Sequence, residues 1–191
     1  MNAPTSRFAL VLLDFQPPPL NSLGDQATSV LDNAATALAW ARAQGLTVAH
    51  VRVGFTPADF EAIAEHNKSF GGLRAGKRFV DGTPECEFVE QMRPEAGEIT
   101  VRKTRFGAFS TTDLEKQLRQ AGVDGLILAG QSSSGVVLST VREAADLDFR
   151  LVVLADACGD PDPELNGFLM ETLFPRQADV ITTSDLDDLV A

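Results

Sequence analysis

Cysteine and histidine are scarce in this chain, which carries two of each among 191 residues. The two cysteines, Cys86 and Cys158, are too few for a disulfide framework and favour free thiols in a reducing compartment. The apolar run near the N-terminus is interrupted by Asp14, so we expect a strand there and not a signal peptide. No apolar run approaches the roughly 20 residues of a membrane span. These absences predict a cytoplasmic protein.

Basic residues are also few, since 16 lysines and arginines face 27 acidic residues, for a formal net charge of -11. Nucleic acids and anionic membranes require clustered positive charge, which leaves a small molecule as the expected partner. The two histidines, His50 and His66, do not form the closely spaced pair of a metal site. The stretch "FGGLRAG" does not join a strand to a helix as phosphate-binding loops do. We therefore expect neither a metal nor a cofactor.

Short apolar runs alternate with helix-like segments along the chain. The runs lie at 8–15, 46–53, 98–103, 125–130, 150–157 and 178–183. Short, nearly continuous apolar runs are typical of strands buried on both faces of a parallel sheet. Their alternation with helices predicts an α/β fold, a three-layer α/β/α sandwich with right-handed crossovers. The length predicts one domain over residues 1–191.

One long stretch, residues 54–96, interrupts this alternation. It is punctuated by glycine and proline and contains no strand pattern. A connection of this length in a compact domain usually serves function. We expect it to act as a lid over a site or as a contact between subunits.

Ligands of parallel α/β sheets bind beyond the carboxyl ends of the strands. Polar residues at those ends are therefore the first candidates for a site. They are Asp14, Gln16, His50, Arg52, Lys103, Arg105, the serines at 132–134, Asp156 and Cys158.

Asp14 and Lys103 are the most informative of these candidates. Asp14 ends an otherwise apolar strand, where an ionised carboxylate is costly unless it is paired. Lys103 ends another strand and could supply the partner, so we expect a buried charge pair across adjacent strand ends. The alternatives are that Asp14 caps the following turn and that Lys103 is a solvated surface lysine.

An ordered set of motifs resembles the isochorismatase-like (cysteine hydrolase) superfamily over nearly the whole chain. The motifs are "LVLLDFQ", "AHVRVGF", "VRKTRFGAFSTTDLEKQLR", "GVDGLILAGQSSSGVVLSTVREAADLDFRLVVLADACGD" and "LFPRQADVITTSDL". The resemblance implies a six-stranded, mainly parallel sheet, a homo-oligomer (dimer or tetramer), and hydrolysis of a small amide, imide or enol ether. It also implies that Asp14 and Lys103 are the catalytic aspartate and lysine.

The same resemblance draws attention to the turn "GQSSSGVVLST". Anchored by Gly130 and Thr140, the family's nucleophilic cysteine falls on Val136, and its cis-peptide falls at Gln131–Ser132. Cys158 is expected to be a small buried residue and not a replacement nucleophile. Around this turn, the residues expected to contact the substrate are Gln16, Phe106, Phe109, Gln131, Ser132, Ser133, Ser134 and Gly135, with Phe15 and Phe55 as further apolar candidates.

Because position 136 is a valine and not a cysteine, three interpretations of the function remain open. In the first, water attacks and Asp14 acts as an acid, although a nearby lysine lowers an aspartate pKa by about 1–3 units unless desolvation outweighs it. In the second, Ser133 or Ser134 is the nucleophile. The alternative for these serines is that they cap the helix that follows, which is the commoner use of serine there. In the third, the chain binds a small molecule without catalysis.

Overall fold

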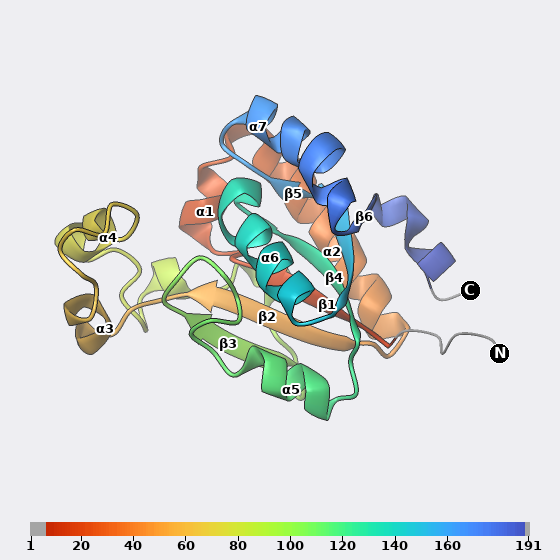
Figure 1. The fold of residues 1–191 in the computed structure, drawn as a ribbon, viewed down its shortest axis with the longest axis horizontal. Coiled ribbons are helices and arrows are strands. Elements are labelled where there is room, and N and C mark those ends of the chain that lie inside the picture. The colour runs from red at the N-terminus through yellow and green to blue at the C-terminus, as the bar shows by residue number, and fades with distance from the viewer. Residues whose placement is uncertain (1–6, 190–191) are drawn as a thin grey trace.

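The computed structural model describes residues 7–189 and contains a six-stranded sheet in the order β3-β2-β1-β4-β5-β6. All neighbouring strands in it are parallel. The strands are β1 (Phe8–Leu13), β2 (Thr47–Val53), β3 (Ile99–Lys103), β4 (Gly125–Gln131), β5 (Arg150–Gly159) and β6 (Asp179–Ile181). Helices cover both faces of the sheet (Figure 1), so the predicted α/β/α sandwich is confirmed.

Alternate side chains of the central strands enter two separate cores. On β1, Leu10 and Leu12 pack toward one face, whereas Val11 and Leu13 pack toward the other. All six residues of β1 and all seven of β4 are buried, as expected for strands covered on both sides. The apolar runs of the sequence therefore become the middle of the sheet.

The longest helix, α2 (Ala27–Ala43), covers one face together with the 3₁₀ segment η7 (Thr183–Leu189). The other face is covered by α5 (Leu114–Gln120), α6 (Leu138–Asp146) and the chain after α7 (Pro163–Phe168). The shorter turns are α1 (Pro17–Asn21), the 3₁₀ segments η1 (Gly24–Gln26), η2 (Pro84–Cys86), η3 (Glu90–Met92) and η6 (Phe174–Arg176), and the π-helical turns η4 (Ser133–Val137) and η5 (Leu169–Leu173). Within residues 7–189, no helix is long and apolar enough to cross a membrane.

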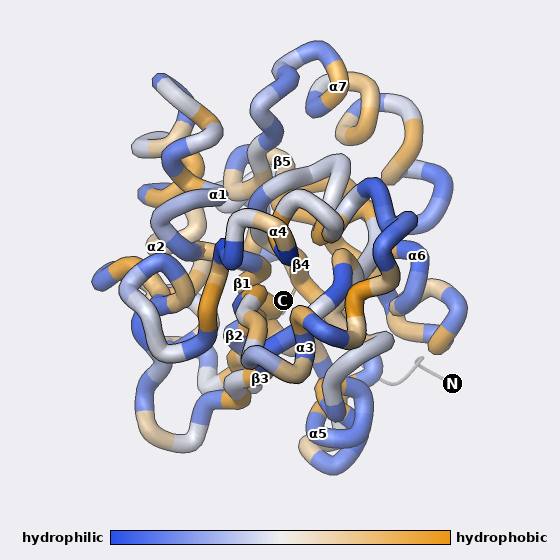
Figure 2. The backbone as a smooth tube through the Cα atoms, turned by 90° about the vertical axis from the view of Figure 1, so that its left-hand side faces the viewer, coloured by the Kyte–Doolittle hydropathy of each residue, from blue (hydrophilic) through white to orange (hydrophobic). Residues whose placement is uncertain are grey.

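The segment between β2 and β3 leaves the layered body. It contains α3 (Pro57–Glu61) and α4 (Gly71–Gly76), which project beyond the end of β2 (Figure 1). A small apolar cluster holds it together, in which Phe55 stacks on Phe60 with ring centroids 5.1 Å apart. Viewed onto the carboxyl ends of the strands, α4 lies in front of β1 and β4 (Figure 2). The segment therefore covers the edge of the sheet where the candidate residues gather.

Candidate active site

Asp14 and Lys103 form an ion pair at the carboxyl edge of the sheet. Lys103 Nζ lies 2.8 Å from Asp14 Oδ2, and both side chains are buried. The expectation of adjacent strand ends is wrong, because β2 lies between β1 and β3. Asp14 adopts a left-handed backbone with φ 57°, a conformation that aspartate tolerates better than most residues. Backbone outliers of this kind cluster at functional sites.

The two oxygens of the Asp14 carboxylate have different surroundings. Oδ2 contacts Lys103, whose Nζ also donates to the backbone carbonyl of Arg105 at 3.2 Å. Oδ1 is buried and has no hydrogen-bond partner in the described part of the chain. Desolvation by burial raises the pKa of the Asp14 carboxyl above its ordinary value, and the Lys103 ammonium opposes this effect without cancelling it. Burial therefore favours the protonated form of Asp14, whereas Lys103 favours the ionised form.

A cavity of about 220 Å³ opens beside this pair. Its polar lining is Asp14, Ser22, Lys103, Arg105, Gln131 and Ser132, and its apolar lining is Pro19, Val53, Phe70, Leu73, Phe79, Phe106, Val136 and Pro161, together with Gly135. Drug-sized ligands usually occupy about 300–1,000 Å³. This cavity suits a smaller molecule that has both an apolar and a polar side.

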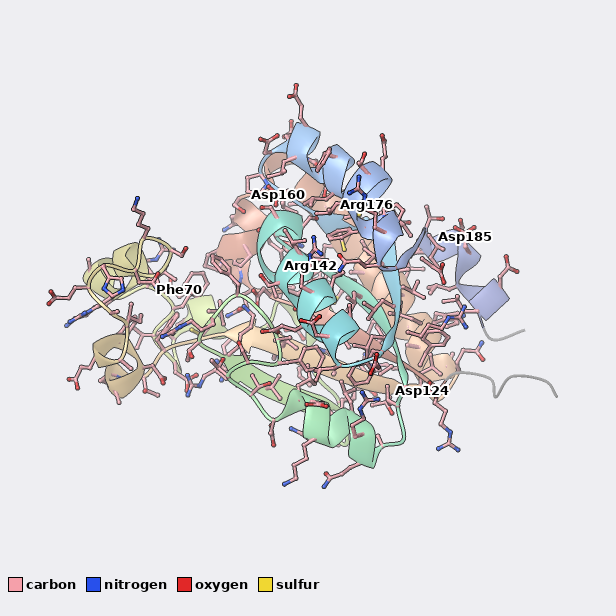
Figure 3. The ribbon with its side chains drawn as sticks, in the orientation of Figure 1. Phe70, Asp124, Arg142, Asp160, Arg176 and Asp185 are labelled. Carbon is pink, nitrogen blue, oxygen red and sulfur yellow. The ribbon has the colours of Figure 1, made fainter. Side chains whose placement is uncertain are left out.

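The long segment supplies much of the apolar wall. Phe70, Leu73 and Phe79 come from the chain around α4, and Phe70 meets Phe106 with ring centroids 4.9 Å apart. Figure 3 labels Phe70 at the base of this projecting segment. The Arg105 guanidinium lies 5.4 Å from the centre of the Phe70 ring. None of these three apolar residues was predicted, because no sequence period connects them to the strand ends.

The serine turn has a cis-peptide at Gln131–Ser132, as predicted. Ser133 is fully buried and its hydroxyl donates to Asn166 Oδ1 at 2.7 Å. The Ser134 hydroxyl and backbone N–H both donate to Asp160 Oδ2, at 2.7 and 2.8 Å. Figure 3 labels Asp160 beside the start of this turn. The alternative in which the serines cap the helix is wrong, because Asp160 accepts the backbone N–H.

Neither Ser133 nor Ser134 lines the cavity, whereas Ser132, Gly135 and Val136 do. Val136 is 2% exposed and joins the core beneath α6. The position that the resemblance gives to the nucleophile therefore presents an isopropyl group to the cavity.

No thiol lines this cavity within residues 7–189. Cys86 and Cys158 are both buried elsewhere, and burial raises the pKa of their thiols to about 11 and about 12. A thiol with so high a pKa is a poor nucleophile at neutral pH, because the thiolate is the reactive form.

Several candidates from the sequence lie outside the cavity. Gln16 is buried, and its Oε1 accepts a hydrogen bond from the Val53 backbone N–H. Its Nε2 donates to the backbone carbonyls of Val53 and Cys86. Phe109 stacks on Phe149 in the core, with ring centroids 5.9 Å apart. Phe15 packs in the core under α2 and Phe55 in the cluster of the projecting segment. These side chains position the strand ends and the cover.

The remaining polar candidates have structural partners. His50 Nε2 lies 2.8 Å from Glu98 Oε2, and Glu98 also accepts two hydrogen bonds from Arg42. Arg52 pairs with Asp81 at 2.8 Å, and Asp156 accepts from Thr183. No cluster of three or more residues suited to a metal occurs in the part of the chain described.

A larger hollow of about 500 Å³ lies at the opposite end of the sheet, beside the first residues of β2 and β3. Glu98 is the acidic residue in its lining, and its carboxylate is already bound by Arg42 and His50. Ligands of such sheets bind at the carboxyl ends instead. The Asp14 cavity is therefore the candidate site.

Comparison with known proteins shows the family of this chain. Residues 8–185 match the isochorismatase domain family. This chain belongs to the isochorismatase family. Maleamate amidohydrolase of Pseudomonas putida is 32% identical over 93% of this chain and 84% of its own length. Ureidoacrylate amidohydrolase of Yersinia enterocolitica is 28% identical over 94% and 88%. The crystal structure of an isochorismatase family protein from Desulfovibrio vulgaris has a TM-score of 0.83 at 29% identity, over 97% of this chain and 98% of that one.

Proposed function

We propose that this chain is a hydrolase of small amides in which water is the nucleophile and Asp14 carries the proton. The observation that supports this most strongly is the buried Asp14–Lys103 ion pair. Asp14 lines the cavity, and its Oδ1 has no hydrogen-bond partner in residues 7–189. The isochorismatase relatives include two amidohydrolases, which favours a C–N bond over an enol ether.

One carboxyl group, that of Asp14, carries out both proton transfers of this reaction. Asp14 takes a proton from water as the water oxygen bonds to the carbonyl carbon of the amide. The same proton then passes to the leaving nitrogen as the C–N bond breaks, which returns Asp14 to its starting state. A raised pKa serves both steps, since a group that titrates nearer the working pH both accepts and donates readily. Lys103 stabilises the carboxylate form of Asp14 before the first transfer and after the second.

The cavity also contains a group that suits an anionic substrate. Arg105 lines it, and its side chain makes no ion pair with any acidic residue among those described. In a chain of net charge -11 this cation attracts a carboxylate to the cavity. A small amide that carries a carboxylate is therefore the substrate favoured by the lining.

The test combines a substrate panel with rapid quenching. Anionic and neutral small amides, esters and enol ethers are screened first, and we expect the anionic amides to react fastest. Turnover of the best substrate is then stopped with acid within milliseconds and the intact protein is weighed. The proposal predicts unmodified protein. A covalent adduct that Ser132→Ala, Ser133→Ala or Ser134→Ala removes would show a serine nucleophile, and turnover of enol ethers alone would show the other bond class.

A further inference from the structure

The side-chain amide of Gln131 has no partner. Gln131 ends β4, lines the cavity and is 1% exposed. Neither its Nε2 nor its Oε1 makes a hydrogen bond with any residue from 7 to 189. Buried amides are nearly always bonded, so an amide left free on both atoms requires an explanation.

Gln131 is also next to the catalytic candidate. The last paired residues of β1 and β4 are Leu13 and Gly130, so Asp14 and Gln131 each follow by one position on neighbouring strands. Neighbouring strands lie about 4.8 Å apart. Two buried polar groups without partners in the described chain, Asp14 Oδ1 and the Gln131 amide, therefore belong to neighbouring residues that both line the cavity.

The direction of the side chain follows from the alternation along β4. Ile127 and Ala129 face the α2 side of the sheet, and Gln131 follows them with the same period. Pro19 and Ser22, at and just after α1, line the cavity on that side. The Gln131 amide thus faces the part of the cavity beneath α1.

We propose that Gln131 recognises the amide-type group of the substrate, through its N–H donor and its carbonyl acceptor side by side. Such a group, a carboxamide, ureide or imide, pairs with both atoms of the Gln131 amide at once. A carboxylate or an ester offers no donor and leaves Oε1 unpaired. A site built to hydrogen-bond an N–H rejects analogues that lack it. This inference rests on the proposed amide hydrolysis and specifies its substrate class.

Binding can be measured separately from turnover. Calorimetry in an Asp14→Asn background compares Gln131→Met with the unchanged glutamine, using matched ligands that differ only at the amide, such as maleamate and monomethyl maleate. We expect Gln131→Met to weaken maleamate binding about 10- to 100-fold, the loss of a paired buried hydrogen bond, and to leave the ester unchanged. The thermal midpoint without ligand should hold or rise, because a buried group without partners is removed.

A matched control is available at Gln177, whose Oε1 is also buried without a partner in the described chain. Gln177 lies near Phe149 and Asp179, at the other end of the sheet. Gln177→Met should not alter either affinity. Equal losses for amide and ester, or a midpoint that falls by several degrees in Gln131→Met alone, would overturn the inference. So would a panel in which no amide, ureide or imide binds. If maleamate binds through Gln131 but is never hydrolysed, the proposed function fails and this inference stands.

Discussion

Lys103 Nζ lies 2.8 Å from Asp14 Oδ2 although the strands that carry them are separated by β2. The pair thus spans the end of β2 and ties β1 to β3 at the cavity. Both groups are almost removed from water, at 6% and 2% exposed. Charges in this position are stable only together, which makes their stability effects strongly coupled.

Asp14→Asn should destabilise the fold markedly, because it leaves the Lys103 ammonium buried without a counter-charge. The loss of one partner from a buried pair typically costs about 3–5 kcal/mol. Adding Lys103→Met to Asp14→Asn should restore part of that stability, as measured by urea unfolding. A double variant whose loss equals the sum of the two single losses would show that the groups are not coupled.

Ser133→Ala and Ser134→Ala should retain activity. Their hydroxyls donate to Asn166 and Asp160 and lie outside the cavity lining. Each substitution removes one hydrogen bond, which contributes about 0.5–1.5 kcal/mol to the free energy of unfolding. Steady-state kinetics and urea unfolding measure the two effects. A loss of kcat beyond tenfold in either variant, with folding intact, would contradict the assignment.

Val136→Cys should create a reactive thiol. The new sulfur would share a cavity with Lys103, whose positive charge favours the thiolate. Intact-mass measurement after iodoacetamide should show one adduct in Val136→Cys and none in the native chain, because Cys86 and Cys158 are buried. Hydrolysis of amides should rise as well. An unmodified Val136→Cys protein would show that the cavity does not admit a nucleophile at this position.

Stability should fall on acidification through Glu98. Burial alone would raise the pKa of this carboxyl, but bonds from Arg42, the Glu95 backbone and His50 lower it to about 2 from 4.5. A lowered folded-state pKa means that the contribution is complete above pH 4.5 and is lost as the pH falls toward 2. Urea unfolding from pH 6 to pH 2.5 should show this slope, and Glu98→Gln should flatten it. An unchanged slope in Glu98→Gln would contradict the lowered pKa.

The buried ion pair between Asp14 and Lys103 could be predicted from the sequence. The carboxyl ends of parallel strands share one edge, and an isolated carboxylate on an apolar strand requires a partner. The order of the strands could not be predicted from the sequence, so the position of β2 between the strands that carry Asp14 and Lys103 was missed. The order of strands in a sheet depends on long-range packing, which the sequence of a single strand does not determine.

The walls of the cavity were predicted less completely. Phe106 follows Lys103 closely in sequence and was named, whereas Phe70, Leu73 and Phe79 depend on the path of the projecting segment. Tertiary contacts such as the Phe55–Phe60 stack fix that path. The serines were misjudged for a related reason, because their partners Asn166 and Asp160 lie 33 and 26 residues further along the chain.

The most direct test of the account is the turnover rate of Asp14→Asn on the best amide found in the panel, at 25 °C where circular dichroism shows the variant folded. Calorimetry on the same sample should show that the amide still binds. The account predicts that kcat falls by about 10²- to 10⁴-fold, the contribution of a well-placed acid or base. A folded Asp14→Asn protein with the native kcat would contradict it.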